Sequence, residues 1–244
     1  MSAGIIPVIF ARLDSRRLPG KVLEPLLAEK CIIDELLVQL GLIAEQVPGV
    51  TEPVIATTAR AVDEPLVDKA RLKGITAITD HFAPLKRLRA IAAANPHCWL
   101  WRVNADSPLL LQPLIEYAAA QLPEADDQVQ VITNLVDRSF PYGVSLEMFR
   151  AAMINAIDLD QATEEELEHI TPVTQQLPAS AIHGITAEDL GLYRFDPSVR
   201  LTIDDAADAG FFRALWADPD FQRTRPGSVE RVNYAYNRRR SGAT

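Results

Sequence analysis

The sequence predicts an α/β fold in which a mostly parallel sheet is sandwiched between two layers of helices. From residue 5 to about residue 134, short apolar segments alternate with longer segments in which apolar residues recur at helical spacing. This alternation is typical of parallel strands joined by right-handed crossover helices. The 244 residues are 48% hydrophobic and 23% charged, as in an ordinary globular protein with a sizeable core. We therefore expect residues 1–244 to form a single domain.

Each element of the alternating region has its own local signal. Short apolar segments predict strands over 5–11, 52–58, 75–79, 98–103 and 128–134. Apolar residues at helical spacing predict helices over 32–47, 62–74, 84–95 and 110–122. Polar loops follow the first strand and the strand over 98–103. Both loops should lie at the carboxyl edge of the sheet, where such folds bind ligands.

The alternation breaks between about residues 135 and 185. Turn residues and strand-like residues are mixed there, and residues 148–159 and 163–170 have helical character. We expect a small excursion from the main fold, a lid or a dimerisation arm there. Residues 200–204 predict a further strand followed by a closing helix, and residues 236–244 predict a disordered tail.

Composition excludes several classes of protein. No apolar run approaches the roughly 18 residues that cross a bilayer, and the first residues lack the basic start of a signal peptide. Cys31 and Cys98 have no metal-binding or redox spacing, which favours reduced cysteines in a cytoplasmic protein. The net charge of −9 argues against general nucleic-acid binding. We expect neither a nucleic acid nor a membrane as partner.

A basic loop, ARLDSRRLPGK over residues 11–21, follows the first predicted strand. Its four cations are Arg12, Arg16, Arg17 and Lys21. Arginine forks and a mobile lysine suit a polyphosphate, and Gly20 lets the backbone approach a ligand closely. The loop is not a Walker motif, because Ser15 stands where the first glycine is required and no Ser or Thr follows Lys21. A merely solvated basic loop is the alternative.

Two acidic residues are candidates for a divalent cation that would accompany a polyphosphate. Asp106 follows the strand over 98–103, and Asp204 ends the strand predicted over 200–204. Mg²⁺ takes one or two carboxylates together with phosphate oxygens. The alternatives are that Asp106 is a turn residue and that Asp204 or its neighbour Asp205 caps the next helix.

Other catalytic patterns are weak. The four histidines form neither an HExxH motif nor a zinc spacing, and no serine lies in a nucleophile elbow. Glu165 and His169 lie one helical turn apart, but a solvated acidic helix explains that pair equally well.

Five segments, taken together, resemble the CMP-sugar synthetase superfamily, and in particular its spore-coat polysaccharide biosynthesis type of cytidylyltransferase. The first, ARLDSRRLPGK, resembles that group's ARxxSxRLPGK signature. Four weaker matches follow in the same order, namely RVNADSPLL, FPYGVSLEMF, EHITP and RLTIDDAAD. The resemblance covers residues 5 to about 216, and it implies a nucleotidyltransferase with a Rossmann-like fold.

The resemblance also implies an activity and a set of site residues. Such enzymes transfer CMP from CTP to an acidic acceptor and release pyrophosphate. The catalytic residues would be Arg12, Lys21 and Asp106. The nucleotide would be bound by Ala11, Arg12, Ser15, Arg17, Gly20 and Lys21, with Arg16 or Arg17 assisting on the phosphates. The metal, Mg²⁺, would be held by Asp106 and Asp204, and the acceptor by Glu147 and His169. A homodimer is the assembly that the resemblance implies.

The chain departs from the family pattern at several positions. Asp14 places a negative charge beside the expected phosphate path, which repulsion disfavours unless Arg16 neutralises it. Thr79, Asp80 and Lys86 also replace other residues of the pattern. These changes suggest an altered acceptor, an altered nucleotide or a loss of activity.

Two alternatives therefore stand beside the cytidylyltransferase. One is a non-catalytic nucleotide-binding relative with a regulatory or scaffolding role. The other is a nucleotide-sugar-dependent glycosyltransferase. Such enzymes usually carry a D-x-D metal motif, and the equivalent loop of this chain holds only one acid, Asp106, which disfavours this alternative.

Overall fold

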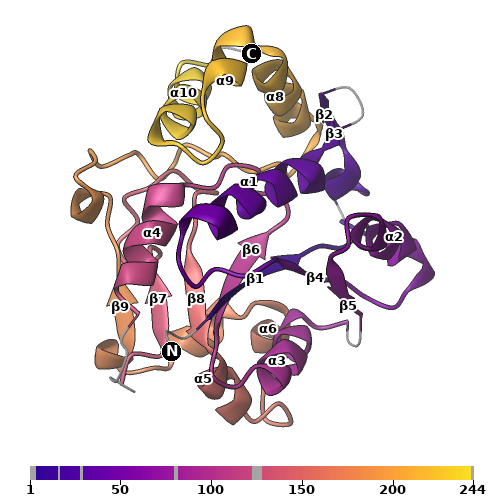
Figure 1. Ribbon diagram of the computed structural model, residues 1–244, viewed down its shortest axis with the longest axis vertical. Helices are drawn as coiled ribbons and strands as arrows, with labels where there is room; N and C mark the ends of the chain where they lie inside the picture. Colours follow the sequence, from indigo (N-terminus) through magenta and orange to yellow (C-terminus); the bar gives the residue numbers. More distant parts are fainter. Residues whose placement is uncertain (1–3, 16, 28–29, 80–81, 123–127, 243–244) are drawn as a thin grey trace.

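A seven-stranded sheet lies at the centre of the computed structural model (Figure 1), which describes residues 4–15, 17–27, 30–79, 82–122 and 128–242. Across the sheet the strands are β5 (Thr76–Ile78), β4 (Val54–Ala56), β1 (Ile5–Phe10), β6 (Trp99–Asn104), β8 (Glu147–Arg150), β7 (Val131–Thr133) and β9 (Ile182–Gly184). Of these seven, only β8 runs antiparallel to its neighbours. A separate hairpin pairs β2 (Pro25–Leu27) with β3 (Lys30–Cys31). The predicted mostly parallel sheet is confirmed.

Helices cover both faces of the sheet. The α-helices are α1 (Ile32–Gln46), α2 (Glu64–Leu72), α3 (Pro84–Ala94), α4 (Gln112–Ala120), α5 (Ala151–Ala156), α6 (Glu164–Glu168), α7 (Thr171–Gln175), α8 (Ala206–Ala217), α9 (Pro219–Arg223) and α10 (Val229–Arg240). Short 3₁₀ turns are η1 (Lys21–Leu23), η2 (Ala61–Asp63), η3 (Ala179–Ala181) and η4 (Glu188–Leu190). Within the described part of the chain, no helix has both the length and the apolar composition that a bilayer crossing needs.

Two apolar clusters, one on each face of the sheet, form the core. Along β1, Ile5 and Ile9 belong to the cluster that includes α1, α2, α4 and α8, whereas Ile6 and Val8 belong to the cluster that includes α3 and α5. This alternation follows from the two-residue period of a strand. The predicted three-layer sandwich is therefore confirmed, with a separate core on each side of the sheet.

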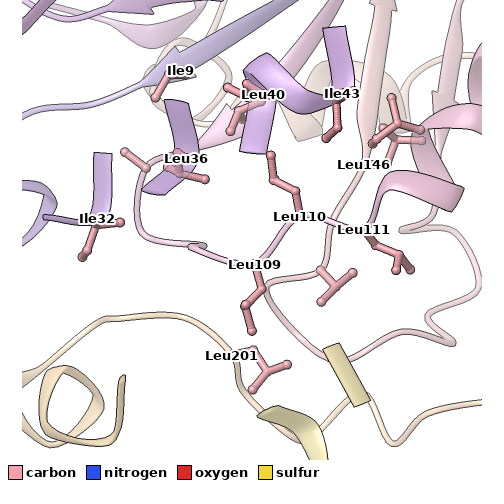
Figure 2. Close-up of a cluster of buried hydrophobic side chains, with 14 of the residues drawn as sticks. Ile9, Ile32, Leu36, Leu40, Ile43, Leu109, Leu110, Leu111, Leu146 and Leu201 are labelled. Carbon is pink, nitrogen blue, oxygen red and sulfur yellow. The ribbon is translucent and has the colours of Figure 1, made fainter. Parts of the chain in front are cut away.

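Helix α1 has a mostly apolar inner face, in which the buried Gln39 hydrogen-bonds to Pro108 and Leu110. In Figure 2, Leu36 and Leu40 of α1 lie near Ile9 and above the loop that contains Leu110. Leu36, Leu40 and Ile9 are all 0% exposed. Burial of each such side chain contributes about 1.5–3 kcal/mol before the loss of conformational entropy. This packing fixes α1 beside the segment that follows β6.

The strand order reverses direction between β1 and β6. From β1 the chain builds β4 and β5 on one side, and then crosses to form β6 on the other side. The parallel register pairs Phe10 with Asn104, and the Ala105 amide donates to the Phe10 carbonyl at 3.2 Å. The loops that follow β1 and β6 therefore leave the sheet side by side. Such a switch point is the usual ligand site of an open α/β sheet.

The segment between residues 135 and 185 belongs partly to the main sheet. Strand β8 pairs with β6 and β7, and β9 extends the sheet beyond β7. The strand predicted over 200–204 is wrong, because this segment makes only an isolated bridge, between Arg200 and Tyr142. It runs instead along the end of the sheet, where the Ile203 amide donates to the Asp106 carbonyl at 2.8 Å.

The C-terminal region contains more helix than the sequence predicted. The disordered tail expected over 236–244 is wrong for residues 236–240, which complete α10, while residues 243–244 lie outside the described residues. Tyr236 is buried, and its hydroxyl accepts a hydrogen bond from the Asp196 amide at 3.1 Å. Arg238 and Arg239 form ion pairs with Asp218 and Asp208. Both aspartates are distant in sequence from the arginines, so the sequence alone made the basic tail look like a solvated segment.

Gly143 should be essential to the position of the segment that carries Asp204. Its φ is +102°, and a Cβ there would lie 2.6 Å from the Leu201 carbonyl oxygen. We expect Gly143→Ala to lower the free energy of unfolding by more than about 2 kcal/mol, since backbone strain and a backbone clash combine. Gly191→Ala is the matched control, because its φ is +69° but nothing lies within 4 Å. Urea denaturation measures both, and equal losses would contradict the steric argument.

Candidate active site

A cavity of about 930 Å³ opens at the carboxyl edge of β1 and β6. Its wall is formed by the loop after β1, the start of α3, the ends of β1 and β6, the region of α6, and Asp204. The charged and titratable residues that line it are Arg12, Arg17, Lys21, Arg87, Arg102, Asp106, Glu164, Glu168, His169 and Asp204. The cavity therefore lies at the topological switch point, where ligands of this class of sheet bind.

Lys21 lies at the point where three separate segments of the chain meet. Gly20 has a left-handed φ of +74°, and its amide donates to the Leu13 carbonyl at 2.8 Å, which closes the loop. Lys21 then begins the η1 turn. Its Nζ donates to Asp106 Oδ2 at 2.8 Å and to the Ile203 carbonyl at 3.0 Å, and lies 3.5 Å from Asp204 Oδ1. One ammonium thus links the loops after β1 and β6 to the segment before α8.

Asp106 and Asp204 converge on that ammonium from different segments. Asp204 also accepts from the Thr202 hydroxyl at 2.9 Å, and it pairs with Arg200. Partial burial opposes ionisation of Asp204, but the Thr202 hydrogen bond, Lys21 and Arg200 outweigh it and lower its pKa. Asp205 instead caps α8, where it accepts from the Asp208 amide at 2.9 Å. The structure thus separates the two acids that the sequence left as alternatives.

Arg12 follows β1 and reaches across the cavity to the segment that contains α6. Its Nη2 donates to Glu168 Oε1 at 2.8 Å, and its Nε lies 3.5 Å from Asp14 Oδ1. The guanidinium also stacks over the Phe82 ring, 5.3 Å from the ring centroid. Its Nη1 is buried, and no residue in the described part of the chain accepts a hydrogen bond from it. Arg12 therefore retains a donor for a ligand even while it is paired with Glu168.

Asp14 is neutralised by a residue that the sequence did not indicate. Arg16, the expected partner, lies outside the described residues. Arg60 instead pairs with Asp14 at 2.6 Å and with the buried Asp63 at 2.9 Å. The hydrogen bond from Arg60 is the main cause of the lowered pKa of Asp14. Asp63 also accepts from the Leu13 amide at 2.7 Å, so the Arg60–Asp63 pair anchors the whole basic loop.

Glu147 does not line the cavity, in contrast to His169, the other residue expected to contact an acceptor. It is 5% exposed and pairs with Arg102 at 2.7 Å. Its other oxygen accepts from the Thr171 hydroxyl at 2.9 Å. Arg102 does line the cavity, and so does the exposed His169. Glu147 is therefore placed to orient Arg102 and not to touch a ligand directly.

The remaining predicted nucleotide residues fall into two groups. Ala11, Ser15 and Arg17 line the cavity, and Arg17 extends towards solvent with 73% of its side chain exposed. Arg17 Nη1 lies 4.0 Å from Asp204 Oδ1. Gly20 is not part of the cavity wall, and it supplies the left-handed turn that positions Lys21.

Sequence reasoning missed three arginines of the site. Arg102 stands in the otherwise apolar CWLWRV, and Arg87 falls on the apolar face of its helix, four positions before Ile91. A cation inside a buried pattern was the available signal for both. Arg60 gave no such signal, because it lies in a polar loop that is far in sequence from its partner Asp14.

Asp106 and Asp204 line the cavity, and two carboxylates of this kind fit a magnesium ion better than a metal that is held by protein alone. Among the described residues, no group of three or more His, Cys, Asp or Glu could hold a metal. Asp106 and Asp204 already enclose a cation, the Lys21 ammonium. Mg²⁺ commonly binds to one or two carboxylates and completes its shell with water and substrate phosphates.

The fold and its cationic cavity define a Rossmann-like α/β protein with a ligand site at the sheet's switch point. The chain belongs to the cytidylyltransferase family, whose sequence profile matches residues 3–176. Spore coat polysaccharide biosynthesis protein SpsF of Bacillus subtilis (strain 168) is 27% identical over 223 residues, which cover 87% of this chain and 86% of that protein. The family that the sequence motifs resembled is therefore confirmed.

Two solved structures share the fold. A cytidylyltransferase from Leptospira borgpetersenii serovar Hardjo-bovis (strain JB197) has a TM-score of 0.78 at 19% identity, with 100% of this chain and 96% of that chain covered. A CMP:2-keto-3-deoxy-manno-octonic acid synthetase, solved in complex with CTP, has a TM-score of 0.60 at 20% identity, with 88% and 99% covered. Both similarities support the α/β nucleotidyltransferase fold predicted from the sequence.

Asp204 should make the free energy of unfolding depend on pH in the acidic range. Its folded pKa lies below the ordinary value of 3.8, so its contribution is present above that pH and is lost as pH falls through the folded value. We expect Asp204→Asn to be about 1 kcal/mol less stable at pH 7, and the difference to shrink below about pH 4. Asp205→Asn is the control, because asparagine caps a helix as well as aspartate. Denaturant titrations at several pH values measure this, and a constant difference would contradict it.

Proposed function

We propose that this chain transfers CMP from CTP to an acidic sugar or a related cell-surface polysaccharide precursor, with release of pyrophosphate. The observation that carries the proposal is the position of Lys21 between Asp106 and Asp204, in the same cavity as Arg12, at the switch point of the sheet. Family membership supports the reaction type. The CTP named with the octonic acid synthetase supports the choice of nucleotide.

The chain's own residues divide the work of binding the triphosphate. Arg12 and Lys21 would contact phosphate oxygens, and the exposed Arg17 would add charge at the mouth of the cavity. Asp106 and Asp204 would hold Mg²⁺, which when bound supplies neutralisation of phosphate charge. Lys21 would then exchange its carboxylate partners for phosphate oxygens. Transfer of this kind depends mainly on positioning and charge stabilisation, which these groups provide.

The acceptor would occupy the part of the cavity formed by the segment between 135 and 185. An acceptor oxygen attacks the α-phosphorus, the bond from that phosphorus to the leaving pyrophosphate breaks, and the acceptor proton passes to a base. His169 lines that part of the cavity, and Arg102 is oriented there by Glu147. A cytoplasmic homodimer remains a prediction from the family resemblance, and light scattering after size-exclusion chromatography would measure the assembly.

Asp106 provides the sharpest test of this proposal. We expect the wild type to release pyrophosphate from CTP, in the presence of Mg²⁺, with one member of a pool of acidic sugars, phosphosugars and phosphonates. Asp106→Asn should lower kcat by at least about a hundredfold, because charge stabilisation of the reacting phosphate is lost. Asp205→Asn, which alters a helix cap and not the cavity, should keep nearly full activity.

Each other result of that assay has a separate meaning. Full activity of Asp106→Asn would overturn the metal assignment. Stabilisation by CTP without pyrophosphate release would favour a non-catalytic nucleotide-binding relative. No stabilisation by any of the four nucleoside triphosphates would overturn the nucleotide site itself.

Glu168 should weaken nucleotide binding by competing for Arg12. The two side chains are about one-third exposed and join at 2.8 Å, so the pair has modest strength. We expect Glu168→Gln to tighten CTP binding about two- to fivefold, because the Arg12 guanidinium then does not have to break an ion pair with a carboxylate before it binds the nucleotide. Isothermal titration with CTP measures this, with Glu164→Gln, a cavity residue outside that pair, as control. Unchanged or weaker binding would show that Glu168 does not restrain Arg12.

A further inference from the structure

Arg87 is a buried cation in the wall of the cavity that the proposed mechanism does not use. It lies in the second turn of α3 and is 2% exposed, yet it lines the cavity together with Phe10 and Arg102. Its guanidinium lies 5.6 Å from the centroid of the Phe10 ring. A residue of this kind is rarely buried without a partner.

No hydrogen bond or ion pair within the described part of the chain satisfies this guanidinium. Both Nε and Nη1 are buried and have no acceptor. Burial, followed by the positive charge of Arg12, lowers the pKa of Arg87 to about 10. The acids whose charge reaches it, Glu168 and Asp63, do not form ion pairs with it. Among the described residues, this buried positive charge therefore has no direct hydrogen bond or ion pair, which is costly.

The surroundings of Arg87 favour a negative ligand. Arg12 Nη1 and Arg102 Nε, in the same cavity wall, are also buried donors that no described residue accepts from. Helix α3 begins in the wall, and its N-cap, Ala83, offers no side-chain acceptor for the first amides. The positive end of the helix dipole thus adds to the three guanidinium groups. A neutral oxygen would satisfy a donor but would leave this charge in place.

Arg87 lies on the helix that packs against the segment proposed to bind the acceptor. Helix α3 packs against α5 and α6. Leu167, near the end of α6, packs against the apolar cluster that contains Leu85 and Leu88 of α3. Arg17 and Lys21, which are assigned to the triphosphate, lie instead on the loop after β1, beside Asp106 and Asp204.

We propose that Arg87 binds the anionic group, a carboxylate or phosphate oxyanion, of the acceptor, and that it is the residue by which the cavity selects an acidic acceptor. The proposal rests on the proposed function, because it assumes that a nucleotide fills the other part of the cavity. Arg102 Nε, which also lines the cavity, supplies a further donor to the same oxyanion. The charge that is uncompensated in the ligand-free protein becomes paired only when the acceptor binds.

Thermal unfolding of the whole protein tests this, with sulfate as the oxyanion probe. Each protein is saturated with CTP and compared in sodium sulfate and in sodium chloride at equal ionic strength. We expect sulfate to raise the wild-type midpoint about 2–4 °C more than chloride does. Arg87→Met should lose that difference, whereas Lys86→Met, a charge loss on the same helix outside the cavity wall, should keep it.

A second measurement separates binding from a structural role. Without ligand, Arg87→Met should unfold at the same temperature as the wild type or higher, because an unpaired buried charge has been removed. A lower midpoint would assign Arg87 to the fold and overturn the proposal. A sulfate difference that is absent from the wild type, or unchanged in Arg87→Met, would also overturn it.

The thermal stabilisation of each protein by CTP alone distinguishes a failure of this proposal from a failure of the proposed function. If CTP does not stabilise the wild type, the nucleotide site has failed and both ideas are overturned. If CTP stabilises the wild type but not Arg87→Met, Arg87 belongs to the nucleotide site, and only the acceptor assignment is overturned.

Discussion

The parallel register between β1 and β6 determines where the charged groups of the cavity lie. Phe10 pairs with Asn104, so the two following loops leave the sheet at the same level, and Lys21 of one loop reaches Asp106 of the other. A slip of one residue would exchange the faces of β6, and Trp101 and Arg102 would trade environments. Both tryptophans of β6 are buried, which makes such a slip costly and holds the site in place.

Charge in the cavity differs sharply from charge in the whole chain. The chain has a net charge of −9, but the described cavity wall holds five cations, Arg12, Arg17, Lys21, Arg87 and Arg102, and four acids, Asp106, Glu164, Glu168 and Asp204. Strongly charged groups gathered in one concave site require compensation in the absence of ligand. Lys21 and Arg12 obtain it from acids that come from distant segments, which ties those segments together.

The local signals of the sequence were sufficient for the layers of the fold and for the ends of β1 and β6, because periodicity and loop position are properties of short segments. They also brought Lys21, Asp106 and Asp204 to one edge. They did not reveal that Arg60 neutralises Asp14, because that pairing depends on how the loop after β4 folds. The family resemblance assigned Glu147 to the acceptor, and the antiparallel pairing of β8 with β6 sets it beside Arg102. Interactions between distant segments were therefore the part that sequence reasoning missed.

The ligand-free protein contains two kinds of cavity cation, and they have opposite effects on stability and binding. A paired cation such as Lys21 stabilises the fold, but a ligand must separate it from its carboxylates before it can bind. An unpaired cation such as Arg87 destabilises the fold and offers its full charge to an arriving anion. A nucleotide that brings several negative charges and a metal ion can displace paired acids, because the metal takes over the carboxylates. An acceptor with one acidic group has no such compensation, so a cation without a protein partner suits it better.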